Sequence, residues 1–117
     1  MQANAETLVN WVQVCREEDL VSNSGVCALI NGQQVALFAI DSESSRQLYA
    51  IDNFDPVGQA NVLYRGIVGS VGDEPVVASP LYKEHYSLVS GHCLDNDTVS
   101  VMTYPVRLEQ GNVLIAV

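Results

Sequence analysis

The sequence predicts an all-β fold, an antiparallel β-sandwich or a partly open barrel, and three observations support this. About eight to ten short segments are rich in valine, isoleucine and aromatic residues, as strands are. Turn residues separate these segments every ~8–12 residues, a spacing typical of sandwiches and barrels. The 117 residues fit one domain, 1–117, and 48% of them are hydrophobic, which is enough for an ordinary core.

The N-terminal segment leads into the first predicted strand. Residues 1–10 are expected to form a loose arm rather than a helix. Segment 11–14 alternates side chains as a half-buried strand does. Segment 16–20 is polar and acidic, and we expect at most one helical turn there.

The clearest element is a hairpin formed by segments 26–30 and 34–40. These apolar segments flank Asn31 and Gly32. Asn-Gly supplies the two positive φ angles of a type I′ turn, whose twist matches that of paired strands. The pattern therefore predicts a tight antiparallel hairpin.

The middle of the chain continues as strands with one interruption. Residues 52–62 break the pattern, with Pro56 and Gly58 close together, and residues 72–74 form a turn. The predicted strands are 47–51, 66–71, 75–78 and 84–89.

The C-terminal part is predicted to form a second hairpin. Strands 104–108 and 112–117 are joined by the turn 109–111. Pro105 cannot donate a hydrogen bond to a neighbouring strand, so its strand lies at an edge or begins there.

The net charge of −9 limits the classes of partner. An acidic surface repels phosphate, which argues against nucleic acid and against anionic membranes. A protein with a basic face is the better candidate, although the charge is equally expected to serve solubility alone. No segment has the basic start and apolar run of a signal peptide, and no apolar run approaches a membrane span, so we expect a cytoplasmic protein.

The cysteines and histidines do not form a metal motif. Cys15, Cys27 and Cys93 are widely spaced, and an odd count argues against a disulfide framework. The adjacent His92 and Cys93 supply two ligands where zinc needs three or four. No metal ligand, catalytic residue or nucleotide-binding motif is therefore assigned, and Cys93 is expected to be a small apolar core residue.

Segment 95–97, Asp-Asn-Asp, has the composition of the start of a calcium loop. An EF-hand loop needs glycine at its sixth position and glutamate at its twelfth. Ser100 and Val106 occupy those positions. We therefore expect a turn stabilised by Asx hydrogen bonds.

Two segments carry a family resemblance. Residues 49–58, Tyr-Ala-Ile-Asp-Asn-Phe-Asp-Pro-Val-Gly, and residues 79–83, Ser-Pro-Leu-Tyr-Lys, resemble the two cluster-binding loops of Rieske-type ferredoxins. The resemblance extends over about residues 10–117. It implies a Rieske-like sandwich whose small loop-bearing subdomain covers about residues 52–93.

The residues at the ligand positions do not match that family. Its loops supply Cys-x-His and Cys-x-x-His, and these positions fall on Asp55, Val57, Ser79 and Tyr82, while Lys83 replaces a glycine. Valine cannot ligate a metal, and carboxylate and hydroxyl are hard donors that poorly replace thiolate. We therefore expect no cluster and no cofactor on this chain.

A narrower resemblance is to the small subunit of NAD(P)H-dependent nitrite reductase, a Rieske-like domain without cluster ligands. The most specific segments are 51–56, Ile-Asp-Asn-Phe-Asp-Pro, and 77–81, Val-Ala-Ser-Pro-Leu. The resemblance implies a non-catalytic, cytoplasmic subunit of an assimilatory enzyme that reduces nitrite to ammonia. The partner that the resemblance implies is a large subunit that carries FAD, an iron–sulfur cluster and sirohaem. The alternatives are a stand-alone interaction module and a ferredoxin-like component of another redox complex.

The former ligand loops suggest a contact with a partner. If they keep the shape of a Rieske tip, Val57, Tyr82 and Lys83 lie at its exposed end, where an aromatic group near a cation suits a protein interface. The competing hypothesis is that Val57 and Tyr82 fill the volume left by the cluster, because protein interiors tolerate few voids.

Overall fold

The computed structural model describes residues 10–117, which form antiparallel sheets and two short 3₁₀ helices. The all-β prediction is confirmed, and all but one residue of the predicted N-terminal arm lies outside the described residues. The strands are β1 (Trp11–Arg16), β2 (Ser24–Ile30), β3 (Gln33–Asp41), β4 (Arg46–Asp52), β5 (Phe54–Asp55), β6 (Ala60–Asn61), β7 (Ile67–Val71), β8 (Glu74–Ala78), β9 (His85–Ser87), β10 (Thr103–Tyr104), β11 (Val106–Glu109) and β12 (Asn112–Ala116).

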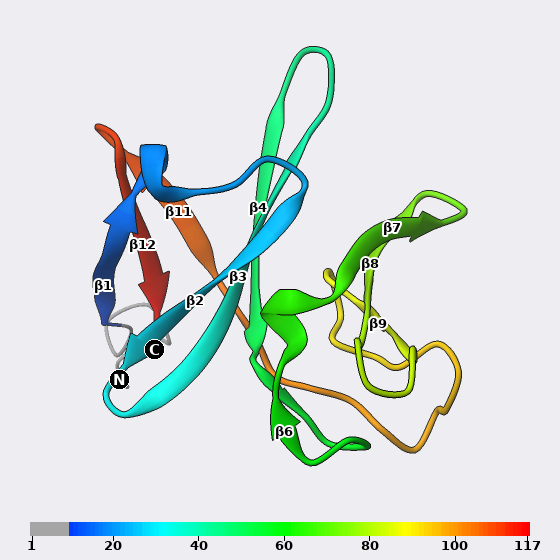
Figure 1. Ribbon diagram of the computed structural model, residues 1–117. Helices are drawn as coiled ribbons and strands as arrows, with labels where there is room; N and C mark the ends of the chain where they lie inside the picture. Colours follow the sequence, from blue (N-terminus) through cyan, green and yellow to red (C-terminus); the bar gives the residue numbers. More distant parts are fainter. Residues whose placement is uncertain (1–9) are drawn as a thin grey trace, which may run out of the picture.

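The sheets divide into a larger and a smaller part (Figure 1). The larger part contains a three-stranded sheet, β1-β12-β11, and a four-stranded sheet, β10-β4-β3-β2. The smaller part contains the pair β5-β6 and the sheet β7-β8-β9. In Figure 1, β1 and β12 lie side by side at one flank, and β7, β8 and β9 lie at the opposite flank. This arrangement is an open sandwich with a separate loop-bearing part.

The β2–β3 hairpin has the turn that the sequence predicts. Asn31 and Gly32 have φ angles of 51° and 82°, and Ile30 pairs with Gln33. Two positive φ angles between directly paired residues define the type I′ geometry. A second turn of this kind, at Gln110 and Gly111, joins β11 to β12, with φ angles of 53° and 81°.

Strand β3 is buried on both faces, which explains its continuous apolar sequence. Adjacent side chains on a strand point to opposite faces. Val35 and Leu37 belong to a core cluster shared with β12, whereas Ala36 and Phe38 belong to a second cluster shared with the loop-bearing part. The second cluster also includes Ile51, Leu63, Val77, Tyr86, Leu88, Cys93 and Val101.

The predicted strand 104–108 is wrong as a single element. Thr103 and Tyr104 pair with β4, whereas residues from Val106 onward pair with β12. Pro105 lies at the crossing between the two sheets, and its carbonyl accepts a hydrogen bond from the Ala116 amide at 3.0 Å. Because proline lacks an N–H group, it suits the point where the chain leaves one ladder for another.

Other boundaries differ less. The 3₁₀ helix Glu17–Asp19 confirms the single predicted turn, and the predicted strand 84–89 shortens to β9 before a turn. Residues 52–62, predicted as a break, contain the two-residue strands β5 and β6, which are too short to produce a sequence period.

Within residues 10–117, no helix has the length and apolar character that crossing a membrane requires.

The two ends of the described chain lie next to each other (Figure 1). The amide of Val117 donates to the carbonyl of Asn10 at 3.0 Å, and the amide of Asn10 donates back at 3.4 Å. These two hydrogen bonds extend the β1–β12 ladder by one residue pair beyond Trp11 and Ala116.

Candidate functional site

The two loops that resemble cluster-binding loops meet inside the smaller part of the molecule. Asp55 ends β5 and Ser79 follows β8, and both residues are buried, with Asp55 fully excluded from solvent. The Ser79 hydroxyl donates a hydrogen bond to Oδ2 of Asp55 at 2.5 Å. Two residues separated by 24 positions in the sequence thus join the loops directly.

A third buried residue completes this network. Tyr86 lies on β9, and its hydroxyl donates to Oδ1 of Asp55 at 2.9 Å. The Val57 amide donates to the same oxygen at 2.9 Å. Both carboxylate oxygens of Asp55 therefore have partners, which a buried carboxylate requires to offset its desolvation. Sequence reasoning missed Tyr86, because a lone tyrosine on a strand has no distinguishing pattern.

The network also decides which protonation state is favoured. Burial acts to raise the pKa of Asp55, but hydrogen bonds from Ser79, Gly58, Tyr86 and Val57 outweigh it, so this pKa lies below its ordinary value. Burial and the neighbouring Asp55 carboxylate hold the pKa of Tyr86 far above its ordinary value. Asp55 is thus an ionised acceptor and Tyr86 a neutral donor, and their hydrogen bond stabilises the loops.

Each of the two loops is closed by a main-chain hydrogen bond of the same kind. The Gln59 amide donates to the Asp55 carbonyl at 2.7 Å, and the Lys83 amide donates to the Ser79 carbonyl at 3.0 Å. Gln59 and Lys83 both have left-handed φ angles, 60° and 66°. Lys83, at the position where the resembling family has glycine, therefore keeps the backbone conformation that glycine adopts most easily. Both loops are thus closed by the same backbone geometry, although their side chains differ.

The remaining predicted residues lie at the surface of these loops. Tyr82 is 69% exposed and Lys83 is exposed, while Val57 is half-buried. The hypothesis that Val57 and Tyr82 fill the interior is wrong for Tyr82, because its side chain is exposed. In the interior, Ser79 and Tyr86 are hydrogen-bonded to Asp55 instead.

Leu81, which sequence reasoning did not select, is also exposed. It packs against Gly58, where an added Cβ atom would lie 2.4 Å from Leu81 Cδ1. The absence of a side chain at Gly58 thus lets the second loop lie directly on the first.

We call the group Val57, Leu81, Tyr82 and Lys83 the tip. It presents aliphatic and aromatic side chains beside one cation. Phe54, at the start of the first loop, is a further exposed aromatic residue. Exposed aromatic and aliphatic side chains of this kind are enriched at protein interfaces.

The residues at the ligand positions do not fit a [2Fe–2S] cluster. Such a centre needs two thiolates on one iron and two imidazoles on the other. The side chains of Asp55 and Ser79 are hydrogen-bonded to each other, Val57 has no donor atom, and Tyr82 is exposed to solvent. Two donors on a tetrahedral ion, with bonds of about 2.0–2.3 Å, lie further apart than two atoms that share a hydrogen bond.

Other candidate ligands are also dispersed. Cys93 is buried in the core as predicted, whereas His92 is exposed. Across residues 10–117, no three side chains of the His, Cys, Asp or Glu type are placed to hold a metal ion. Asn96 Oδ1 accepts from the Thr98 amide at 3.1 Å, which confirms the predicted Asx turn in segment 95–97.

Known proteins share both the sequence pattern and the fold of this chain. Residues 10–116 match the model of the family described as Rieske-like [2Fe–2S] domain. The chain is similar to the nitrite reductase (NADH) small subunit of Salmonella typhimurium, with 40% identity over 86% of this chain and 92% of that protein. A solved structure of a putative NADH-dependent nitrite reductase small subunit from Mycobacterium tuberculosis aligns with a TM-score of 0.86, at 38% identity over 93% of this chain and 96% of that one.

A further relative has a different length. The nitrite reductase [NAD(P)H] large subunit of Klebsiella oxytoca is 37% identical over 90% of this chain. The match covers only 11% of that protein. A domain similar to this one is thus part of a much longer polypeptide there, whereas in Salmonella typhimurium it makes up nearly the whole protein.

Proposed function

Because the chain belongs to the nitrite reductase small subunits of the Rieske-like [2Fe–2S] domain family, we propose that it is the non-catalytic partner of a large nitrite reductase subunit. The observation that carries this proposal is the 40% identity across nearly the full length of a named small subunit. The Klebsiella oxytoca protein supports the choice of partner, because a similar domain lies within a chain that is itself named a large subunit.

The proposed reaction is the reduction of nitrite to ammonia in the cytoplasm, as part of nitrogen assimilation. Electrons come from NADH or NADPH and pass through FAD, an iron–sulfur cluster and sirohaem, all of them on the large subunit. The small subunit supports or positions that subunit and carries no electrons itself. This division of labour follows from the family resemblance.

The proposal that this chain carries no cofactor is supported by the chemistry of Asp55, Ser79 and Tyr86. Ser79 and Tyr86 both donate hydrogen bonds to Asp55. Asp55 and Ser79 stand at the positions where the resembling family has its thiolate ligands. A buried hydrogen-bond network whose donors and acceptors all have partners is rigid enough to hold two loops together without a metal. Purified alone, the protein is therefore expected to be colourless and free of iron and acid-labile sulfide.

The tip, Val57, Leu81, Tyr82 and Lys83, is the proposed contact with the large subunit. Its exposed apolar groups would be buried on association, and the net charge of −9 favours a basic face on the partner. An aromatic residue beside aliphatic neighbours is also the composition in which binding energy concentrates.

The proposal is tested by isolating the complex from the native host. An affinity tag on this chain should retain a large, coloured flavin- and sirohaem-containing protein, and the eluate should oxidise NADH or NADPH only when nitrite is added. Ammonia should accumulate in proportion. A tagged chain that retains no such protein, or an eluate whose NAD(P)H oxidation does not respond to nitrite, would refute the proposal.

A further inference from the structure

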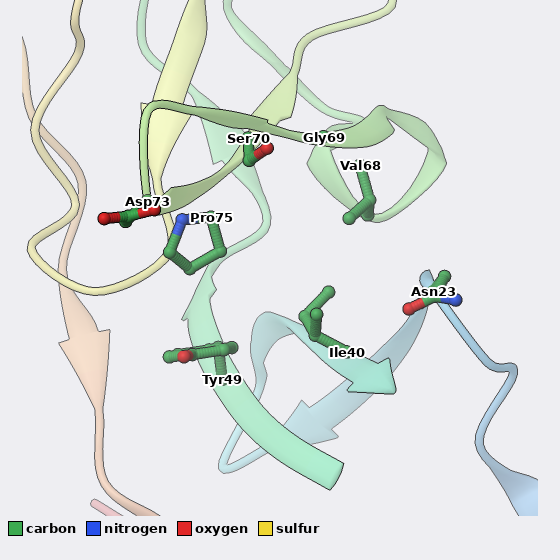
Figure 2. A pocket seen from close by; sticks show the side chains of 8 residues that line it. All are labelled: Asn23, Ile40, Tyr49, Val68, Gly69, Ser70, Asp73 and Pro75. Atoms are coloured by element: carbon green, nitrogen blue, oxygen red, sulfur yellow. The ribbon is translucent and has the colours of Figure 1, made fainter. Parts of the chain in front are cut away.

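A groove separates strand β7 from the central sheet. It has a volume of about 430 Å³ and lies between the β7–β8 hairpin and the strands β3 and β4. Its apolar lining comes from Ile40, Tyr49, Val68 and Pro75, and Asn23 and Asp73 stand at its margins. Figure 2 shows Val68 above Ile40 and Pro75 above Tyr49, with open space between the upper and lower pairs. The two layers therefore do not close on each other here.

Strand β7 is an edge strand without the usual protection. Strand order β7-β8-β9 leaves one side of β7 unpaired. Natural sheets protect such edges with charges, prolines or bulges. Residues 67–71 read Ile-Val-Gly-Ser-Val, a sequence with neither charge nor proline, and Ile67 is 78% exposed. The edge is thus open to pairing with another chain.

The register of the hairpin identifies which main-chain groups are free. Val71 pairs with Glu74 across the two-residue turn, and in an antiparallel ladder every second pair exchanges hydrogen bonds. The amide and carbonyl groups of Val68 and Ser70 therefore point away from β8. Among the described residues, no main-chain hydrogen bond outside the strands uses either residue.

Residues on the free edge of β7 also line the groove. Val68, Ser70 and Pro75 lie on the face of the hairpin that lines the groove. Neighbouring strands in a sheet point alternate side chains to the same two faces. A strand added beside β7 would therefore bind Val68 and Ser70 through its main chain and insert every second side chain over Ile40.

Charge limits which kind of segment can occupy the groove. Asp73 stands at its margin and takes part in none of the ion pairs formed within residues 10–117. A basic residue on the incoming segment would pair with it. A second copy of this chain would instead bring another net charge of −9 to the same edge, which opposes self-association.

We propose that strand β7 and this groove receive an extended segment of the large subunit, with apolar side chains at alternate positions and a basic residue facing Asp73. The segment adds a strand to the β7-β8-β9 sheet, a mode in which main-chain hydrogen bonds give affinity and alternate side chains give specificity. This inference rests on the proposed function for the identity of the partner. The surface is distinct from the tip and would act with it.

The first test is amide hydrogen exchange of the chain alone and in complex with the purified large subunit. Val68 and Ser70 amides should exchange quickly in the free chain and become protected in the complex. The Gly69 amide, which faces β8, is the internal control and should be protected in both states. A complex that forms while Val68 and Ser70 continue to exchange quickly would overturn the inference.

The second test compares two lysine substitutions on the same strand. Ser70→Lys places a charge on the groove face, and Val71→Lys adds the same charge on the opposite face. Calorimetric titration against the large subunit should show binding about tenfold or more weakened for Ser70→Lys, and within about twofold of wild type for Val71→Lys. Equal affinity of folded Ser70→Lys and wild type would overturn the inference.

These outcomes separate the inference from the proposed function. If wild type does not bind the large subunit, the proposed function fails. If wild type binds and either Ser70→Lys or exchange at Val68 and Ser70 shows no effect, only the groove inference fails. If sedimentation shows that the chain alone forms dimers with protected Val68 and Ser70 amides, a second copy occupies the edge and the inference is likewise overturned.

Discussion

Asp55 and Ser79 hold together, through a single 2.5 Å hydrogen bond, the two loops that a Rieske-type domain joins through its metal centre. Each loop is closed by a main-chain hydrogen bond and has a left-handed residue, Gln59 or Lys83. A carboxylate and a hydroxyl thus connect the two loops directly.

Substitution of Asp55 by alanine should lower the free energy of unfolding by about 3 kcal/mol, because it leaves the buried hydroxyls of Ser79 and Tyr86 without an acceptor. Urea unfolding followed by circular dichroism measures this. Asp73→Ala is the matched control, because Asp73 is exposed and unpaired among the described residues, and its effect should stay within about 0.5 kcal/mol. Equal effects of both substitutions would contradict the assigned role of Asp55.

Acid should destabilise the protein partly through Asp55. The pKa of Asp55 is lowered in the folded chain, so the folded state favours the ionised form and the unfolded state binds the proton first. The stabilisation is complete above the unfolded pKa of about 3.9 and is lost as the pH falls through the folded pKa. Ser79→Ala removes one hydrogen bond to the carboxylate, and it should make the loss of unfolding free energy between about pH 5 and pH 2 shallower than in wild type. An unchanged slope would show that Ser79 does not lower this pKa.

Asp41 should titrate at an unusually low pH. Hydrogen bonds from Arg46, at 2.6 and 2.8 Å, and from Ser22 lower the pKa of Asp41 to about 2. Carboxyl carbon NMR shifts measured against pH should show this midpoint. Arg46→Gln should move it toward the ordinary value of about 3.9, whereas Arg107→Gln, which removes a cation paired with Glu109 instead, should leave it unchanged. A midpoint that stays near the wild-type value without Arg46 would identify Ser22 as the main cause.

Gly91 should tolerate a side chain much less well than Gly72. Both have positive φ angles, 79° and 61°, so alanine is strained at either position. An added Cβ atom at Gly91 would lie 2.1 Å from the Val101 carbonyl oxygen, whereas at Gly72 it would contact nothing within 4 Å. Gly72→Ala should cost about 1 kcal/mol of unfolding free energy and Gly91→Ala about 3 kcal/mol or more. Similar melting temperatures for the two variants would contradict the close approach of Gly91 to Val101.

Tyr82→Ala should weaken binding to the large subunit about tenfold without changing stability, because the side chain is exposed in the free chain and buried in the proposed complex. Calorimetry measures the affinity and thermal unfolding measures the stability. Leu29→Ala removes a 71% exposed side chain from β2 in the larger part and should affect neither. Wild-type affinity of Tyr82→Ala would remove the tip from the proposed interface.

Local signals in the sequence predict local structure well. Asn31 and Gly32 specify the first hairpin by themselves, because the two φ angles of a type I′ turn depend on those residues alone. The prediction of segment 104–108 as one strand is wrong, because the change of sheet at Pro105 depends on the positions of β4 and β12. The sequence around Pro105 contains no pattern that depends on the positions of these distant strands.

The site was predictable in position but not in chemistry. The resemblance located Asp55 and Ser79 from the spacing of their loops, but their hydrogen bond depends on how two segments 24 residues apart approach each other. Tyr86 could not be selected, because its importance comes from reaching Asp55 across the core. Leu81 was missed for a related reason, since its contact with Gly58 depends on how the two loops approach each other.

The mutual hydrogen bonds between Asn10 and Val117 have a genetic consequence. A domain whose ends leave side by side can be encoded alone or spliced into a longer reading frame with little change in its interior. Fusion and fission of genes then become nearly neutral events for its folding. Such events would produce relatives that differ greatly in length. The Salmonella typhimurium small subunit and the Klebsiella oxytoca large subunit differ in this way.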